Sequence, residues 1–170
     1  MTPVRKPFEE EPSPLRVRAI APASVMLGSS LTILPMVTNM PLLPPFGLLL
    51  LLGWRLLRPD VFRIWAAVPL GLFDDCLSGQ PIGSAMLFWT LCFFVIDVID
   101  NRLMFRDFWQ NWLIAAGSVS FCLIAGRLVA TPLSAQVDTP LLLQILVSIL
   151  LYPLAARVAG WLDLKRGVVE

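Results

Sequence analysis

Histidine is absent from this chain of 170 residues. Its absence excludes histidine-based acid–base catalysis, a Ser-His-Asp triad and histidine ligation of a metal. Charged residues are also scarce, because they make up 15% of the sequence, whereas an average soluble domain holds about 25%. The basic residues form no patch with interleaved aromatic residues, so we expect no binding to nucleic acid.

Cysteine is nearly absent too. Cys76, Cys92 and Cys122 are the three in the chain, and each lies inside or at the edge of an apolar run. A free cysteine in such a run behaves as a small hydrophobic residue, and no pair has the spacing of metal ligands. We therefore expect no disulfide, no metal site and no cofactor. The aspartates carry most of the remaining ionisable chemistry.

What the sequence does contain is hydrophobic residues, which make up 57% of it. They recur in runs of about 17 to 22 residues, the length that crosses a ~30 Å hydrocarbon core. This pattern predicts an all-α integral membrane protein, a polytopic bundle of six transmembrane helices. The expected spans are residues 19–37, 42–57, 61–77, 82–99, 109–129 and 140–161. The leucine-rich second span is expected to face lipid.

Two polar segments flank the predicted membrane domain, which covers residues 19–162. Residues 1–18 hold four prolines and mixed charge, which predicts a flexible tail, and residues 163–170 form a short second tail. All of the 13 basic residues except Arg127 fall on one side of the six-span topology. Because short cytoplasmic loops collect Lys and Arg, both termini are expected in the cytoplasm. Arg127 is expected to reach the outer surface or to pair with an outer carboxylate, namely Asp74, Asp75 or Asp138.

The stretch GLFDDCLSGQPIG, residues 71–83, joins the third and fourth spans on the outer side. On a helix, one face would carry four of its residues: Gly71, Asp74, Asp75 and Ser78. Two interpretations of the acidic pair remain open. Membrane carboxylates often form an ion or substrate site, but these two could instead accept hydrogen bonds from the backbone amides of the turn, and we favour the second interpretation. Gly79 is expected to adopt a positive φ, and Gly83 to make a contact that excludes a side chain.

Asp97 and Asp100 lie at the inner end of the fourth span. An intramembrane aspartyl protease needs two aspartates at one depth, but Asp97 is roughly 21 Å along the helix axis from the turn. Asp97 and Asp100 are therefore expected to pair across the cytoplasmic interface with Arg55, Arg58 or Arg63.

Small residues recur every four positions in the fifth span, at Ser118, Cys122 and Gly126. Such a stripe allows the backbone of a neighbouring helix to approach closely. We expect these three residues to pack helices together.

The segment LLLLLGWRLLRPDVFRIWAAVPLGLFDDCLSGQPIG, with the apolar span after it, resembles the rod shape-determining protein MreD family. The resemblance covers about residues 42–99. The matching positions are Leu70, Gly71, Asp74 or Asp75, Ser78, Gly79, Pro81 and Gly83. Their spacing favours Asp75 as the aspartate of the motif.

The resemblance implies a non-enzymatic inner-membrane component of the bacterial elongation machinery. Such a protein would bind the bitopic protein MreC, and through it connect MreB filaments to peptidoglycan synthesis by RodA and a class B penicillin-binding protein. The fold would resemble the six-helix substrate-binding subunits of energy-coupling factor vitamin transporters. That likeness supplies the alternative function, a small-molecule transporter subunit, but the spans offer few of the converging polar groups that a small-molecule cavity needs.

Overall fold

The computed structural model describes residues 14–31, 43–79, 81–102, 107–130 and 138–167. These residues form six α-helices and no strand, which confirms the all-α class. The helices are α1 (Pro14–Ser30), α2 (Phe46–Leu57), α3 (Ala67–Ser78), α4 (Ser84–Arg102), α5 (Phe108–Ala130) and α6 (Asp138–Gly167), with a short 3₁₀ turn, η2 (Ile64–Ala66), before α3. Most of the tail expected at residues 1–18 lies outside the described part, and α1 already includes its last five residues.

Each of the six expected spans overlaps one of these helices, but the bounds differ and the helices vary in length. Three of them, α4, α5 and α6, are long and apolar enough to cross a membrane. The helices α2 and α3 have 12 residues each, which corresponds to about 18 Å at 1.5 Å per residue. A membrane core of ~30 Å is longer than that. The structure therefore confirms six helices, of which three have the length of a full span.

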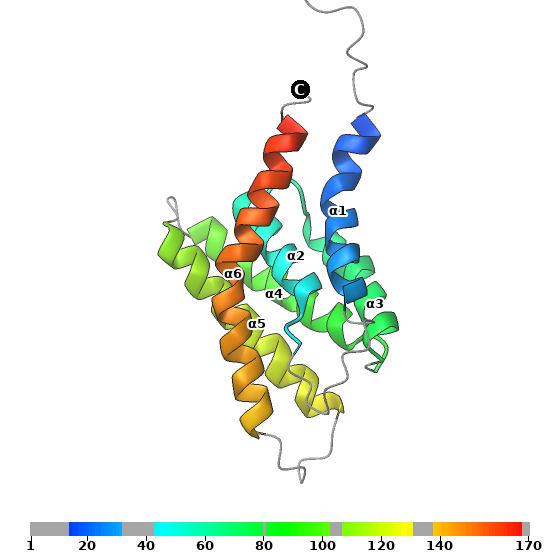
Figure 1. Cartoon of the computed structure of the whole chain (residues 1–170), viewed down its shortest axis with the longest axis vertical. Coiled ribbons are helices and arrows are strands. Elements are labelled where there is room, and N and C mark those ends of the chain that lie inside the picture. Colours follow the sequence, from blue (N-terminus) through cyan, green and yellow to red (C-terminus); the bar gives the residue numbers. More distant parts are fainter. Residues whose placement is uncertain (1–13, 32–42, 80, 103–106, 131–137, 168–170) are drawn as a thin grey trace, which may run out of the picture.

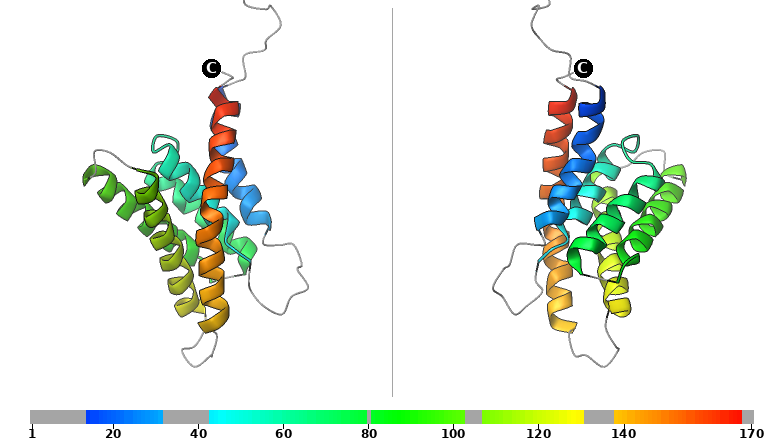
Figure 2. Two further views of the ribbon diagram at one scale, coloured as in Figure 1. Left: turned by 60° about the vertical axis from the view of Figure 1, so that its left-hand side comes forward. Right: turned by 90° about the vertical axis from the view of Figure 1, so that its right-hand side faces the viewer.

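The helices α1, α3, α4, α5 and α6 surround α2 (Figure 1). Around the bundle, α1 packs against α3, α3 against α4, α4 against α5 and α5 against α6. The inner helix α2 packs against α1, α5 and α6. Figure 2 shows that the start of α1 and the end of α6 lie side by side at one end of the molecule.

The leucine-rich helix α2 is the core of the bundle, so the expectation that it faces lipid is wrong. Its buried leucines are Leu48, Leu49, Leu51, Leu52 and Leu56, each at most 6% exposed. A helix that is apolar on every side has no polar face to turn to water, and in a bundle it can be covered by protein on every side. The large apolar residues that remain exposed belong mostly to α4, α5 and α6 instead, among them Leu91, Leu113, Leu146 and Leu150.

Candidate functional site

The turn between α3 and α4 depends on two glycines. Gly79 follows the last residue of α3 with φ 66°, in the left-handed region, which confirms the positive φ predicted for it. Gly83 precedes α4 with φ 99°. Residues with a Cβ are strained at both values, so the turn requires glycine on conformational grounds. Between the glycines, Pro81 is exposed and its carbonyl accepts a hydrogen bond of 3.0 Å from the Ser84 amide.

Asp75 is 1% exposed and caps the N-terminus of α4. Its Oδ1 accepts hydrogen bonds of 2.9 Å from the Ala85 amide and from the Ser84 hydroxyl. Its Oδ2 accepts one of 2.9 Å from the Gly83 amide and a longer one, 3.4 Å, from the Met86 amide. The first amides of a helix have no acceptor within that helix, and their partial positive charge favours an anion. A side chain of α3 therefore satisfies the start of α4. The favoured interpretation of the acidic pair holds for Asp75, whereas the partner of Asp74 is Ser29.

Gly71 of α3 lies against the backbone of α4. A Cβ at this position would lie 2.6 Å from the Met86 Cα and 2.9 Å from the Ala85 carbonyl carbon. No atom of the described residues lies within 4 Å of the corresponding point at Gly83. The prediction that Gly83 makes the contact that excludes a side chain is therefore wrong, because Gly83 is needed for its φ and Gly71 makes that contact.

Asp74 faces a different part of the bundle. It is half-buried and shares a hydrogen bond with Ser29 of α1. Its Oδ1 lies 3.2 Å from the point where a Cβ would stand at Gly47 of α2. Asp74 therefore belongs to the junction of α1, α2 and α3, whereas Asp75 belongs to the start of α4. Ser78, on the same side of α3, is exposed.

The small-residue stripe of α5 packs against α4. Cys122 and Gly126 are buried and Ser118 is half-buried. The Sγ atoms of Cys92 and Cys122 lie 3.5 Å apart, and the Cys92 Sγ lies 3.8 Å from the Ser118 carbonyl oxygen. Part of the predicted stripe is therefore occupied by the chain's own α4.

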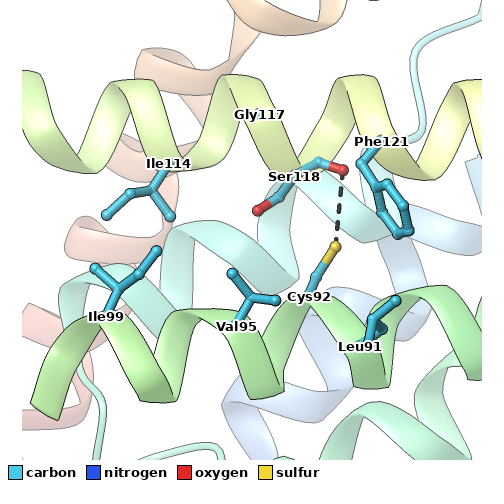
Figure 3. A pocket seen from close by; sticks show the side chains of 8 residues that line it. All are labelled: Leu91, Cys92, Val95, Ile99, Ile114, Gly117, Ser118 and Phe121. Carbon is cyan, nitrogen blue, oxygen red and sulfur yellow. Dashed lines mark hydrogen bonds between the residues drawn. The ribbon is translucent and has the colours of Figure 1, made fainter.

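Beside this contact, α4 and α5 line an open groove of about 360 Å³ (Figure 3). We call it the α4–α5 groove. Besides Cys92 and Ser118, it is lined by Leu91, Val95, Ile99, Ile114, Gly117 and Phe121. No atom of the described residues lies within 4 Å of a Cβ built at Gly117, so that position is open.

At the other end of α4, a buried arginine joins α2 to two aspartates. Arg55 is 3% exposed, and its Nη2 lies 3.2 Å from both the Asp97 Oδ1 and the Asp100 Oδ2. Its guanidinium also lies 5.8 Å from the centre of the Phe93 ring. Of the three arginines considered as partners, Arg55 is the one that pairs with these aspartates. Arg58 pairs instead with Asp163 of α6, at 2.9 Å.

Sequence reasoning missed three residues that complete this site: Ser84, Ser29 and Gly47. Ser84 could have been found, because a serine just after a Pro-x-Gly turn is a typical helix start. Nothing in the sequence places Ser29 and Gly47 beside Asp74, since their helices meet only in the folded bundle. Arg127 and its expected outer partner stay a prediction, and the Asp138 side chain lies outside the described part of the structure. Within that part, no three Cys, Asp or Glu side chains are placed to hold a metal ion.

Comparison with known proteins gives one match. The family model described as rod shape-determining protein MreD matches residues 18–158. No curated protein and no solved structure matches the chain. The expected likeness to the substrate-binding subunits of energy-coupling factor transporters, and with it the transporter function, therefore receives no support.

Proposed function

The chain belongs to the rod shape-determining protein MreD family, and we propose that it is a multi-pass component of the bacterial inner membrane with both termini in the cytoplasm. The observation that carries the proposal is the family match, which runs from the first helix to the last. The three long apolar helices support a membrane location. The asymmetry of the basic residues supports the orientation.

Within the machinery that determines rod shape, the proposed role is that of a non-enzymatic scaffold. The protein binds an MreC-like bitopic partner, and through it helps to couple MreB filaments to peptidoglycan synthesis by RodA and a class B penicillin-binding protein. The contacts that three aspartates make between helices support this role. Asp75 caps a neighbouring helix, while Asp97 and Asp100 hold Arg55, so these three connect helices to one another.

The proposed contact for the partner's single transmembrane helix is the α4–α5 groove. Both of its helices have the length of a membrane span. Transmembrane helices associate through close packing, for which small residues provide the space. Gly117 and Ser118 are the small residues of this groove, and the apolar side chains around them offer contact area.

Two variants test the contact. Gly117→Leu fills the groove at a position where a Cβ meets no described atom, so the fold should tolerate it. Leu143→Phe on α6 is the matched control, because it enlarges a side chain that is exposed and lies outside the groove. We expect Gly117→Leu to lower co-purification of the partner at least tenfold and to round the cells, with an unchanged melting temperature. Leu143→Phe should leave partner, shape and melting temperature as they are.

The two levels of the proposal fail in different ways. If Gly117→Leu keeps the partner and the rod shape, the groove is the wrong contact. If depletion of the whole protein leaves cells rod-shaped, the role in the elongation machinery is wrong.

A further inference from the structure

A second hollow, of about 570 Å³, opens where the end of α2 and the start of α5 meet the middle of α6. Its volume falls within the ~300–1,000 Å³ of typical small-molecule sites. Leu57, Phe108, Leu150 and Leu154 line it, and Arg157 is the one charged residue among its lining residues. We call it the Arg157 hollow. Nothing in the proposed scaffold role uses it.

At this hollow, the exposed face of α6 changes from apolar residues to basic and aromatic ones. Residues 150, 154, 157, 161 and 165 follow one another at intervals of three or four, so they share one face of the helix. All five are exposed, and they read Leu, Leu, Arg, Trp and Lys. The Lys165 Nζ lies 3.8 Å from the centre of the Trp161 ring. Tryptophan and lysine at a helix end are typical of the membrane–water interface.

The positions of these residues along α6 match the depths of the headgroup and the acyl chains of a phospholipid. At 1.5 Å per residue, Arg157 lies about 6 Å deeper than Trp161, and Leu150 about 10 Å deeper than Arg157. The face therefore runs from headgroup depth at Trp161 and Arg157 to acyl-chain depth at Leu154 and Leu150.

Arg157 lacks an anionic partner within the part of the chain that the structure describes. The carboxylate of Asp163, which follows Arg157 on α6, pairs with Arg58 at 2.9 Å. An arginine at the edge of a membrane is stabilised by an anion, and its planar guanidinium fits the oxygens of a phosphate in pairs. An exposed arginine at one end of an apolar hollow is thus complementary to an amphiphile with one anionic end.

We propose that the Arg157 hollow binds one phospholipid with a net negative headgroup. Its phosphate contacts Arg157, and an acyl chain lies along Leu154 and Leu150. Lys165 adds a second positive charge at headgroup depth, which favours phosphatidylglycerol over a zwitterionic lipid such as phosphatidylcholine.

Thermal unfolding of the full chain, purified and delipidated in detergent, tests the proposal with three additives. Phosphatidylglycerol should raise the melting temperature by several degrees, since a ligand that binds the folded state stabilises it. Phosphatidylcholine should raise it much less, and glycerol phosphate, which carries the same anion without acyl chains, should not raise it. Equal shifts with both lipids would overturn the preference for an anionic headgroup. A shift with glycerol phosphate as large as that with phosphatidylglycerol would show a plain anion site.

Two arginine variants locate the effect. Arg157→Gln should reduce the shift with phosphatidylglycerol to that with phosphatidylcholine, whereas Arg63→Gln should keep it, because Arg63 is exposed and lies outside the Arg157 hollow. An undiminished shift in Arg157→Gln would reject the site. Should that variant fail to fold, native mass spectrometry of the wild-type chain decides. One retained phosphatidylglycerol per chain, in competition with phosphatidylcholine, supports the site, and retention of the two lipids in the mixing ratio rejects it.

Discussion

At the scale of single residues, Asp74 and Asp75 show how adjacent side chains of one type acquire different roles. Successive residues of an α-helix point about 100° apart. One carboxylate therefore faces the start of α4, and the other faces Ser29 of α1 and Gly47 of α2. The two adjacent aspartates therefore make two separate structural contacts in the bundle.

The cap at Asp75 predicts a graded series of substitutions. Both carboxylate oxygens accept hydrogen bonds, whereas the amide of asparagine offers one acceptor oxygen and turns an NH₂ donor toward the other amides. Leucine accepts nothing. We expect Asp75→Asn to lower the free energy of unfolding by about 1 kcal/mol and Asp75→Leu by about 3 kcal/mol, within the range for unpaired buried groups.

Thermal or denaturant unfolding in detergent measures this series. Asp74→Asn is the control, because Asp74 takes no part in the cap of α4. Equal melting of Asp75→Leu and wild type would contradict the capping role. If Asp75→Asn folds as stably as wild type but loses the partner and the rod shape, the negative charge itself is functional, and the ion or substrate interpretation of the pair regains support.

The contact at Gly71 predicts a large effect from one methyl group. In Gly71→Ala the new Cβ would meet the α4 backbone at 2.6 Å, so the two helices must separate. We expect a loss of about 1–3 kcal/mol, the usual cost of overpacking. Gly117→Ala is the matched control, since its Cβ meets no described atom, and alanine favours the helix by about 1 kcal/mol. Comparison of the two melting temperatures checks this, and a Gly71→Ala variant as stable as Gly117→Ala would contradict the close approach.

At the scale of helices, α2 organises the bundle through packing and through one charge. Its leucines fill the interior, and Arg55 near its end carries a buried charge to the aspartates of α4. A buried charge is stable only when it is paired. This requirement aligns the C-terminal ends of α2 and α4.

Removal of Arg55 should therefore cost more than removal of either aspartate. Loss of one partner of a buried pair costs about 3–5 kcal/mol. We expect about 2–3 kcal/mol for Arg55→Ala, below that range, since the Asp97 side chain is 45% exposed and water screens it. Asp97→Ala should cost less than half as much, because Asp100 still pairs with Arg55. Unfolding of the two variants side by side gives the order, and a larger loss in Asp97→Ala would contradict it.

The contact between α4 and α5 is open to a chemical test. The Sγ atoms of Cys92 and Cys122 lie 3.5 Å apart, whereas Cys76 is exposed on α3. In the Cys76→Ser variant, a membrane-permeant oxidant should form a disulfide bond between Cys92 and Cys122 of one chain. Mass spectrometry of the proteolysed protein would detect the linked peptides. The control Cys76→Ser/Cys122→Ser should give no such product, and free thiols after complete oxidation would place α4 and α5 farther apart than the structure does.

At the scale of the whole molecule, the two ends of the described chain lie together. The start of α1 and the end of α6 share one end of the bundle (Figure 2), and Arg58 at the end of α2 pairs with Asp163 in the last part of α6. The proposed orientation puts this end in the cytoplasm and the α3–α4 turn outside.

Reporter fusions check this orientation. A reporter that works only in the periplasm should be inactive when fused after Glu170 and active when inserted after Gly79. A reporter that works only in the cytoplasm should give the reverse. Periplasmic activity of the fusion at Glu170 would contradict the orientation, and cytoplasmic activity at Gly79 would contradict the proposed topology of α3 and α4.

The sequence by itself determined the helical class, the places of the six helices and the conformation of Gly79. These properties follow from local physics: the length of apolar runs, the scarcity of charge, and the need of a tight turn for glycine. The pairing of Asp97 and Asp100 with a basic residue could be predicted as well, because an acidic residue at a membrane edge needs a cation at the same depth. Three arginines met that condition, so the sequence did not determine which of them is the partner.

Only the tertiary structure decided which helix lies inside and which contacts exclude a side chain. Leucine is equally suited to lipid and to a protein core, so the sequence of α2 could not distinguish the two environments, and packing by its neighbours placed it inside. Gly71 and Gly83 look alike in sequence, but one touches the backbone of α4 and the other only bends the chain. Such contacts join residues of different helices, and they exist only once those helices have packed.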